Sequence, residues 1–173
     1  MQEIPFFATS AAFAMRVGQL ASTLYEQMDD CLLSEGLKLP GYATSIVQSL
    51  HHGGPQSISG LAQRLQLSHQ LASQRVNWLV AAGLAASAPG KADRRVRVIR
   101  LTKLGQAEAE KLQAFLPRID RAYTSLFAEL GLDLHQAMLR ASAALEERPL
   151  HSRFGEGATA LVGGATTQPV GAQ

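Results

Sequence analysis

The sequence predicts a mainly α-helical fold that carries one small antiparallel β-hairpin. Apolar residues recur at three- and four-residue steps over most of the chain, which is the spacing of a helix with one buried face. Residues 84–101 depart from this spacing, with short β-branched, alternating segments on either side of a turn. Apolar residues make up 46% of the 173 residues, which is enough for a globular core.

Composition excludes several classes of protein. Cys31 is the single cysteine, which rules out an intramolecular disulfide and a zinc site built on several thiolates. No apolar run approaches the roughly 18 residues needed to cross a bilayer, and the N-terminus lacks the features of a secretion signal. We therefore expect a cytoplasmic protein with no membrane partner. The formal net charge of +2 is too small on its own to indicate a nucleic-acid-binding protein.

The N-terminal part of the chain predicts two helices. The first runs over residues 10–35, with Ser10 as its candidate N-cap. Pro40 suits the first turn of the second helix. The run 51–55, which contains two glycines and a proline, ends that helix.

Two further short helices follow, with a tight turn between them. Ser57 or Ser59 is a candidate N-cap for the first, and Ser68 is one for the second, which extends to Ala82. Gly83 comes directly afterwards, at the position where glycine commonly ends a helix. Two short helices joined by a tight turn are typical of a helix-turn-helix.

A hairpin comes next. Residues 84–88 and 96–101 predict its strands, and residues 89–93 predict a loop longer than a two-residue turn. Helical spacing then resumes from Thr102 to about Leu130.

Two features mark the C-terminal part of the chain. Pro117 is expected to kink or break the helix that contains it. Gly131 ends this helix and Asp133 caps the last one. Residues 152–173 are rich in Gly, Ala, Thr and Gln with almost no charge, and predict a disordered tail.

Basic residues concentrate around the helix-turn-helix and the hairpin. Between Gly60 and Gly105 the only acid is Asp93. The basic residues of this segment are Arg64, Arg75, Lys91, Arg94, Arg95, Arg97, Arg100 and Lys103. Such a concentration is the footprint expected of a protein that neutralises phosphates.

The second helix of the pair has an uncharged polar outer face. Opposite its apolar positions Ala72, Val76 and Leu79 lie short donors and acceptors: Ser68, His69, Gln70, Ser73, Gln74 and Asn77. Gln and Asn can bond adenine bidentately in the major groove, and Ser can bond bases or phosphates. The free N–H groups at a helix N-terminus also suit a phosphate.

These residues together resemble the winged helix-turn-helix of MarR-type transcriptional regulators. The resemblance, from about Gly36 to Gly105, rests on Leu61-Ala62-x-x-Leu65, Leu67-Ser68, Leu79-x-x-x-Gly83-Leu84, Asp93-Arg94-Arg95 and Leu101-Thr102-x-x-Gly105. The Asp-Arg-Arg tip followed by a strand and Leu-Thr-x-x-Gly is its most specific part. The fold it implies is mainly α, a winged helix-turn-helix with a small antiparallel β wing, flanked by N- and C-terminal dimerisation helices.

The resemblance also implies a domain organisation. Residues 1–151 would form a single domain, with dimerisation helices over 10–35 and 103–148 and the winged helix-turn-helix over 37–102. The functional form would be a homodimer on a pseudopalindromic operator in double-stranded DNA. It would act as a repressor released by a small aromatic or phenolic ligand.

In such a complex, the helix 68–82 enters the major groove and the wing 89–95 reaches the minor groove. In the family's wing the aspartate pairs with the second arginine after it, which maps to Asp93 and Arg95. The implied DNA-contacting residues are Ser57, Ser68, His69, Gln70, Ser73, Gln74, Asn77, Lys91, Asp93, Arg94, Arg95 and Arg97. Two residues depart from the family pattern: Arg75 is expected to face a phosphate or solvent, and Trp78 to fill an edge of the core or, as the less favoured alternative, to contact a sugar.

Candidate residues for a ligand cleft between the dimerisation helices and the DNA-binding lobe are Tyr25, Met28, Tyr42 and His51. They have polar tips or soft side chains. Filling such a cleft would shift the population away from the state that binds DNA.

Other kinds of regulation stay open. Cys31 would suit a thiol-responsive regulator, but the acids at 29, 30 and 35 disfavour the thiolate, and a partly buried structural cysteine is expected. A metal-responsive regulator could use Cys31 with Glu26 and His51 or His52, although the helices after the wing contain only His135. No metal site is therefore predicted.

An enzyme is not expected. The sequence has no Gly-rich phosphate loop, no paired cysteine motif and no His-Glu-x-x-His, so no catalytic residue and no cofactor is predicted. A winged helix that docks on protein without binding DNA is the remaining alternative. Such a module would not need a wing as basic as residues 91–100.

Overall fold

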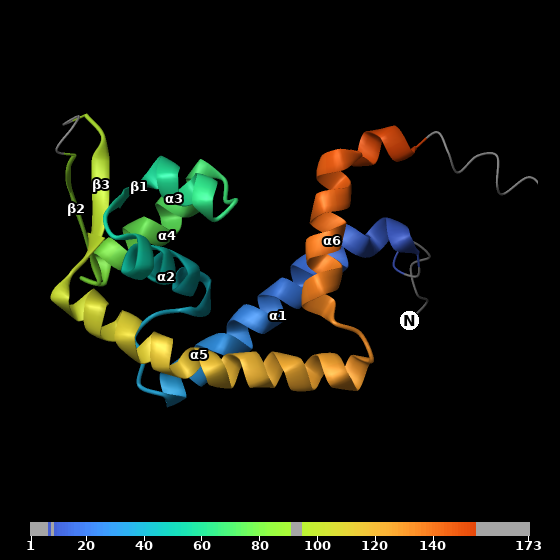
Figure 1. The fold of residues 1–173 in the computed structure, drawn as a ribbon, viewed down its shortest axis with the longest axis horizontal. Helices are drawn as coiled ribbons and strands as arrows, with labels where there is room; N and C mark the ends of the chain where they lie inside the picture. Colours follow the sequence, from blue (N-terminus) through green and yellow to red (C-terminus); the bar gives the residue numbers. More distant parts are fainter. Residues whose placement is uncertain (1–6, 8, 91–94, 155–173) are drawn as a thin grey trace, which may run out of the picture. The chain divides into compact units, whose positions relative to one another are not determined.

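The computed structural model describes residues 7, 9–90 and 95–154 (Figure 1). The chain divides into two compact units, Met1–Pro117 and Arg118–Gln173. The first unit contains η2 (Ser10–Ala12), α1 (Phe13–Ser34), η3 (Gly41–Ala43), α2 (Thr44–Gly53), β1 (Gln56–Ser57), α3 (Ile58–Arg64), α4 (His69–Ala81), β2 (Ala85–Pro89) and β3 (Arg97–Leu101). Helix α5 (Lys103–Leu130) begins in this unit and continues into the second. The second unit also holds α6 (Leu134–Glu147) and η4 (Leu150–Arg153). The mainly helical fold with a small antiparallel sheet is confirmed.

The caps of the helix-turn-helix are those the sequence indicates. The Ser57 hydroxyl accepts the Gly60 N–H at 3.0 Å, and the Ser68 hydroxyl accepts the Leu71 N–H at 3.1 Å. Gly83 has φ +72° and ends α4, with the Leu84 N–H bonded to the Leu79 carbonyl. This left-handed position favours glycine, and it turns the chain directly from α4 into the wing.

Two expectations about helix ends are corrected, and a break at Pro117 is not observed. Thr9, rather than Ser10, caps the first helical turn, with its hydroxyl accepting the Ala11 N–H. Pro40 precedes the short turn η3 instead of standing in the first turn of α2. Helix α5 is continuous through Pro117, so the proline does not break it.

The sheet has three strands in the order β1-β3-β2, all antiparallel. The predicted hairpin is present as β2 and β3, with Ser87 opposite Ile99. Strand β1 was not predicted, because two residues are too short for a period-2 pattern. Its residues Gln56 and Ser57 pair with Ile99 and Val98 and so attach the start of α3 to the wing.

The core of the first unit lies among the end of α1, α2, α3, α4, the sheet and the start of α5. Its fully buried larger side chains include Leu32, Ile46, Val47, Leu61, Val76, Leu79, Leu84, Ile99 and Leu112. The predicted inner positions Ala72, Val76 and Leu79 of α4 are all buried. Burial of this apolar face fixes which side of α4 points away from the unit.

Helix α4, the wing and α5 meet at the backbone of Leu84. The Leu84 carbonyl accepts the Thr102 N–H at 3.0 Å, and the Thr102 hydroxyl donates to the Gly83 carbonyl at 2.7 Å. The same hydroxyl accepts the Gly105 N–H at 3.1 Å and thereby caps α5. A Cβ on Gly105 would lie 1.8 Å from the Leu84 oxygen. Only glycine permits this close approach of α5 to the end of α4.

We predict that Gly105→Ala lowers the free energy of unfolding by about 1–3 kcal/mol or more, because the added methyl overlaps backbone that cannot move aside easily. The measurement is urea denaturation followed by circular dichroism. Gly18→Ala is the matched control, since Gly18 lies within α1 with nothing within 4 Å of an added Cβ. It should raise the same free energy by about 0.5–1 kcal/mol. Equal effects of the two substitutions would contradict the contact.

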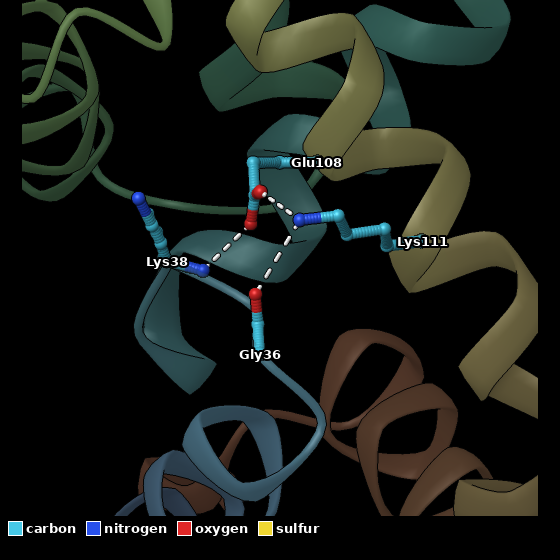
Figure 2. A network of polar contacts seen from close by, with 4 residues as sticks. All are labelled: Gly36, Lys38, Glu108 and Lys111. Carbon is cyan, nitrogen blue, oxygen red and sulfur yellow. Dashed lines mark hydrogen bonds and ion pairs between the residues drawn. The ribbon is translucent and has the colours of Figure 1, made fainter.

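A buried carboxylate ties α5 to the segment between α1 and α2 (Figure 2). Glu108 is 2% exposed, and it accepts the Lys38 backbone N–H at 2.6 Å and pairs with Lys111 Nζ at 2.8 Å. Lys111 also donates to the Gly36 carbonyl at 3.4 Å. Burial raises the pKa of the Glu108 carboxyl, but the Lys111 and Lys38 hydrogen bonds and charges outweigh burial and hold that pKa below its ordinary value.

This pairing predicts an acid-sensitive contribution to stability. Because the folded-state pKa of Glu108 is lowered, the contribution is present above the unfolded-state pKa of about 4.3 and is lost as the pH falls through the folded value. Glu108→Gln should therefore lower the free energy of unfolding by about 1–3 kcal/mol at pH 7, and by less at pH 3. Urea titrations across this range measure the difference. The exposed neighbour Glu110 supplies the control Glu110→Gln. A difference in free energy of unfolding between the wild type and Glu108→Gln that stayed the same at low pH would contradict the proposed pairing of Glu108.

Candidate nucleic-acid interface

Helix α4 presents two chemically different faces. Its inner face buries Ala72, Val76 and Leu79 against the unit. Its outer face exposes five of the residues that the sequence singles out, namely the cap Ser68 together with His69, Gln70, Gln74 and Asn77. The outer face therefore offers hydroxyl, imidazole and amide groups to solvent along the length of the helix.

Two other predicted residues are less accessible. Ser73 is half-buried at the edge of the outer face of α4. Ser57 is also half-buried, and its hydroxyl is occupied by the cap of α3 at 3.0 Å from the Gly60 nitrogen. Its place in the fold is thus the last residue of β1 and the N-cap of α3.

The wing carries exposed arginines. Arg95, Arg97 and Arg100 are all exposed, and Arg97 Nε donates to the Ser87 hydroxyl across the two strands at 2.7 Å. The Gly90 N–H bonds to the Val96 carbonyl at 2.8 Å and closes the base of the loop. Lys91, Asp93 and Arg94 lie outside the described residues, and so does the expected pairing of Asp93 with Arg95.

The sequence led us to expect that Arg75 faces a phosphate or solvent. This expectation is wrong. Arg75 is 8% exposed, on the inner side of α4, with its guanidinium carbon 5.9 Å from the centre of the Tyr25 ring. Its Nε is buried and has no hydrogen-bond partner in the described part of the chain. The reason is its position: residue 75 belongs to the same helical stripe as Ala72 and Leu79, so the stripe carries it inward.

Three of the candidate ligand residues lie on α1 and η3, and η3 packs against both α1 and α4. Trp78, one turn along α4 from Arg75, is half-buried. Its ring packs edge to face on that of Tyr42 in η3, with 6.3 Å between the ring centres, which agrees with its expected core role. Met28 lies against Gly41, where an added Cβ would come within 3.0 Å of the methionine side chain. We call the set Tyr25, Met28, Tyr42, Arg75 and Trp78 the aromatic corner.

His51 lies elsewhere in the first unit. Its Nδ1 is 3.0 Å from the Gln106 amide nitrogen on α5. Its ring packs edge to face on the His52 ring, with 4.9 Å between the ring centres. It therefore contacts α5 through hydrogen bonding, whereas the other three ligand candidates belong to the aromatic corner.

Arg75 is the residue of this region that sequence reasoning missed. The signal was present, because a cation at an inner position of an amphipathic helix is unusual and indicates a partner. The concentration of basic residues around it hid that signal, since Arg75 was grouped with the outer charges.

The structure also bears on the other proposed signals. Cys31 is exposed on α1, rather than partly buried as expected. Across residues 7, 9–90 and 95–154, no three His, Cys, Asp or Glu side chains come close enough together to hold a metal ion. No helix in those ranges is long and apolar enough to cross a membrane.

The fold and this surface define a winged helix-turn-helix protein. Residues 36–96 match the model of the MarR family, while no curated protein matches the chain. The matched part of the chain, which holds the helix-turn-helix, is therefore similar to the MarR family.

Solved structures share the fold. The S. aureus MepR–DNA complex aligns with a TM-score of 0.62 at 17% identity, over 79% of this chain and 97% of that one. The PcaV transcriptional regulator from Streptomyces coelicolor, in complex with its natural ligand, gives 0.61 at 16%, over 86% and 99%. The heme sensor protein PefR from Streptococcus agalactiae, in complex with heme, gives 0.52 at 21%, over 80% and 95%. At these identities the likeness shows the fold of MarR-family regulators.

Proposed function

We propose that this protein is a homodimeric transcriptional regulator that binds a pseudopalindromic operator in double-stranded DNA. The observation that carries the proposal is the exposed outer face of α4, which is polar and has no acid, next to a wing that exposes Arg95, Arg97 and Arg100. A helix of this kind fits the major groove, which is wide enough to admit it. Its N-terminus places backbone N–H groups toward a phosphate.

The wing has a different task in this proposal. Arginines supply affinity by replacing the counterions that condense on phosphates. An arginine inserted into a narrow minor groove is also favoured by its negative potential. In this proposal Arg95, which is exposed at the end of the wing loop, inserts into the minor groove, while Arg97 and Arg100 on β3 contact the DNA backbone. The MepR–DNA complex supports this use of the shared fold.

Dimerisation is supported by apolar side chains that a single chain leaves exposed. In the first unit, α1 exposes Phe13, Leu20 and Leu33, the last at 74%. In the second unit, α6 buries none of its residues, although Met138, Leu139 and Leu145 lie on it. Apolar surface of this extent is typical of helices that pair with a second copy. Two copies present two α4 helices to two half-sites.

The output proposed is repression relieved by a small aromatic acid. A buried guanidinium with an unpartnered Nε is costly, and an anion that bonded to Arg75 would offset this cost. The Tyr25 ring beside the Arg75 guanidinium, and the Tyr42–Trp78 pair one turn along α4, suit an aromatic body. Because Arg75 belongs to α4, a ligand there would act on the same helix that contacts DNA.

The proposed DNA binding is tested by titrating the full chain with the promoter region beside its own gene and with a scrambled duplex, at several salt concentrations. We expect a preference of about a thousandfold or more, with affinity falling steeply as salt rises. Equal, weak binding to both duplexes would contradict a regulator of this promoter. It would favour the alternative of a winged helix that docks on protein.

Arg95→Ala should lower operator affinity, reduce the preference for A·T pairs beside the half-sites, and reduce the slope of log K against log salt by about 1. The same titration measures all three effects. Arg121→Ala, an exposed arginine on the second part of α5, is the control and should change none of them. Unchanged binding by the Arg95 variant would show that the wing does not contact DNA.

Arg75→Met should abolish the response to an aromatic acid while leaving the fold intact, because methionine fills the buried space without a charge. Benzoate is the probe and benzamide its neutral, isosteric control. We expect benzoate to raise the melting temperature of the wild-type chain and weaken its DNA binding, and benzamide to do neither. Identical responses to the two compounds, or an undiminished benzoate response in the variant, would contradict the role of Arg75.

A further inference from the structure

The outer face of α4 carries a stripe of amides in place of charges. Gln70, Gln74 and Asn77 stand four and three residues apart, so they lie along one side of the helix, and all three are exposed. Their side chains make no hydrogen bond to any described residue. The one arginine of α4, Arg75, is buried on the other side, and the helix contains no lysine or carboxylate.

This composition limits which bases α4 can read. Guanine is most often read through its O6 and N7 acceptors by arginine or lysine, and neither is available on the outer face. An amide side chain offers one donor and one acceptor, which match N7 and the N6 amino group of adenine. We propose that Gln70 and Gln74 each read an adenine in the major groove of the operator half-site, an inference that rests on the proposed DNA binding.

The position along the helix selects these two residues. The N-terminal residues of a recognition helix are the ones that commonly reach base edges, and Gln70 and Gln74 occupy the first two turns of α4. They are separated by about 6 Å along the axis, because a helix rises about 1.5 Å per residue. With about 3.4 Å between base pairs, the two adenines lie about one or two pairs apart.

The experiment is selection of binding sites by the full chain from a library of random duplexes, for the wild-type protein and for Gln74→Ala. We expect paired half-sites with adenine at two nearby positions, one of which loses its preference in the variant. Gln136→Ala, which removes an exposed glutamine from α6, is the control and should select the wild-type sequence. Thermal melting verifies that each variant is folded.

A gain of specificity provides a second variant. Gln74→Arg should change the preference from adenine to guanine at the position that Gln74→Ala relaxes, because a guanidinium bonds guanine bidentately. In the wild-type site, 7-deazaadenine at that position removes the N7 acceptor and should weaken binding by about 5- to 150-fold, with no further loss in Gln74→Ala.

The outcomes separate the two proposals. Selected half-sites that contain guanine at the positions dependent on Gln70 and Gln74, or that are unchanged in both Gln74 variants, would overturn the adenine assignment while leaving DNA binding in place. A library that yields no enriched sequence with the wild-type chain would overturn the proposed function, and the assignment with it.

Discussion

The geometry of the interface depends on one close backbone contact, the approach of Gly105 to the Leu84 carbonyl. Leu84 follows the end of α4, and its carbonyl also accepts the N–H of Thr102 at the end of β3. The start of α5, the wing and α4 are thereby joined at one point with little room for adjustment. This junction sets the positions of the outer face of α4 and of the wing arginines. The residues that form the junction are not themselves among the proposed DNA contacts.

Most of the fold could be predicted from the sequence, because its determinants are local. The hydroxyls of Ser57 and Ser68 cap helix N-termini, and the left-handed φ of Gly83 ends α4. Each of these effects acts within a few residues of the chain. Strand β1 could not be predicted, since its two residues depend on pairing with β3 some forty positions later. Of the candidate site, the outer face of α4 followed from helical periodicity. The burial of Arg75 escaped notice because its partner Tyr25 lies fifty residues earlier.

Helix α4 has one side exposed to solvent and one side buried in the first unit. On its outer side, amides and a capping serine are exposed, while on its inner side Arg75 and Trp78 contact Tyr25 and Tyr42 of the N-terminal segment. In the function proposed here, the outer side reads DNA and the inner side responds to a small anion. A change at the aromatic corner needs no long pathway to reach the DNA, because both sides belong to thirteen residues of one helix.

The central claim, that two copies of α4 enter the major groove, is tested most directly by cleavage of DNA from the helix itself. Asn77→Cys in a Cys31→Ser background gives one thiol on the outer face of α4, to which a chelated iron can be attached. On a selected operator, we predict two localised cleavage centres related by two-fold symmetry and about 10 base pairs, or a multiple, apart. A single centre, or cleavage spread evenly along the duplex, would contradict the account.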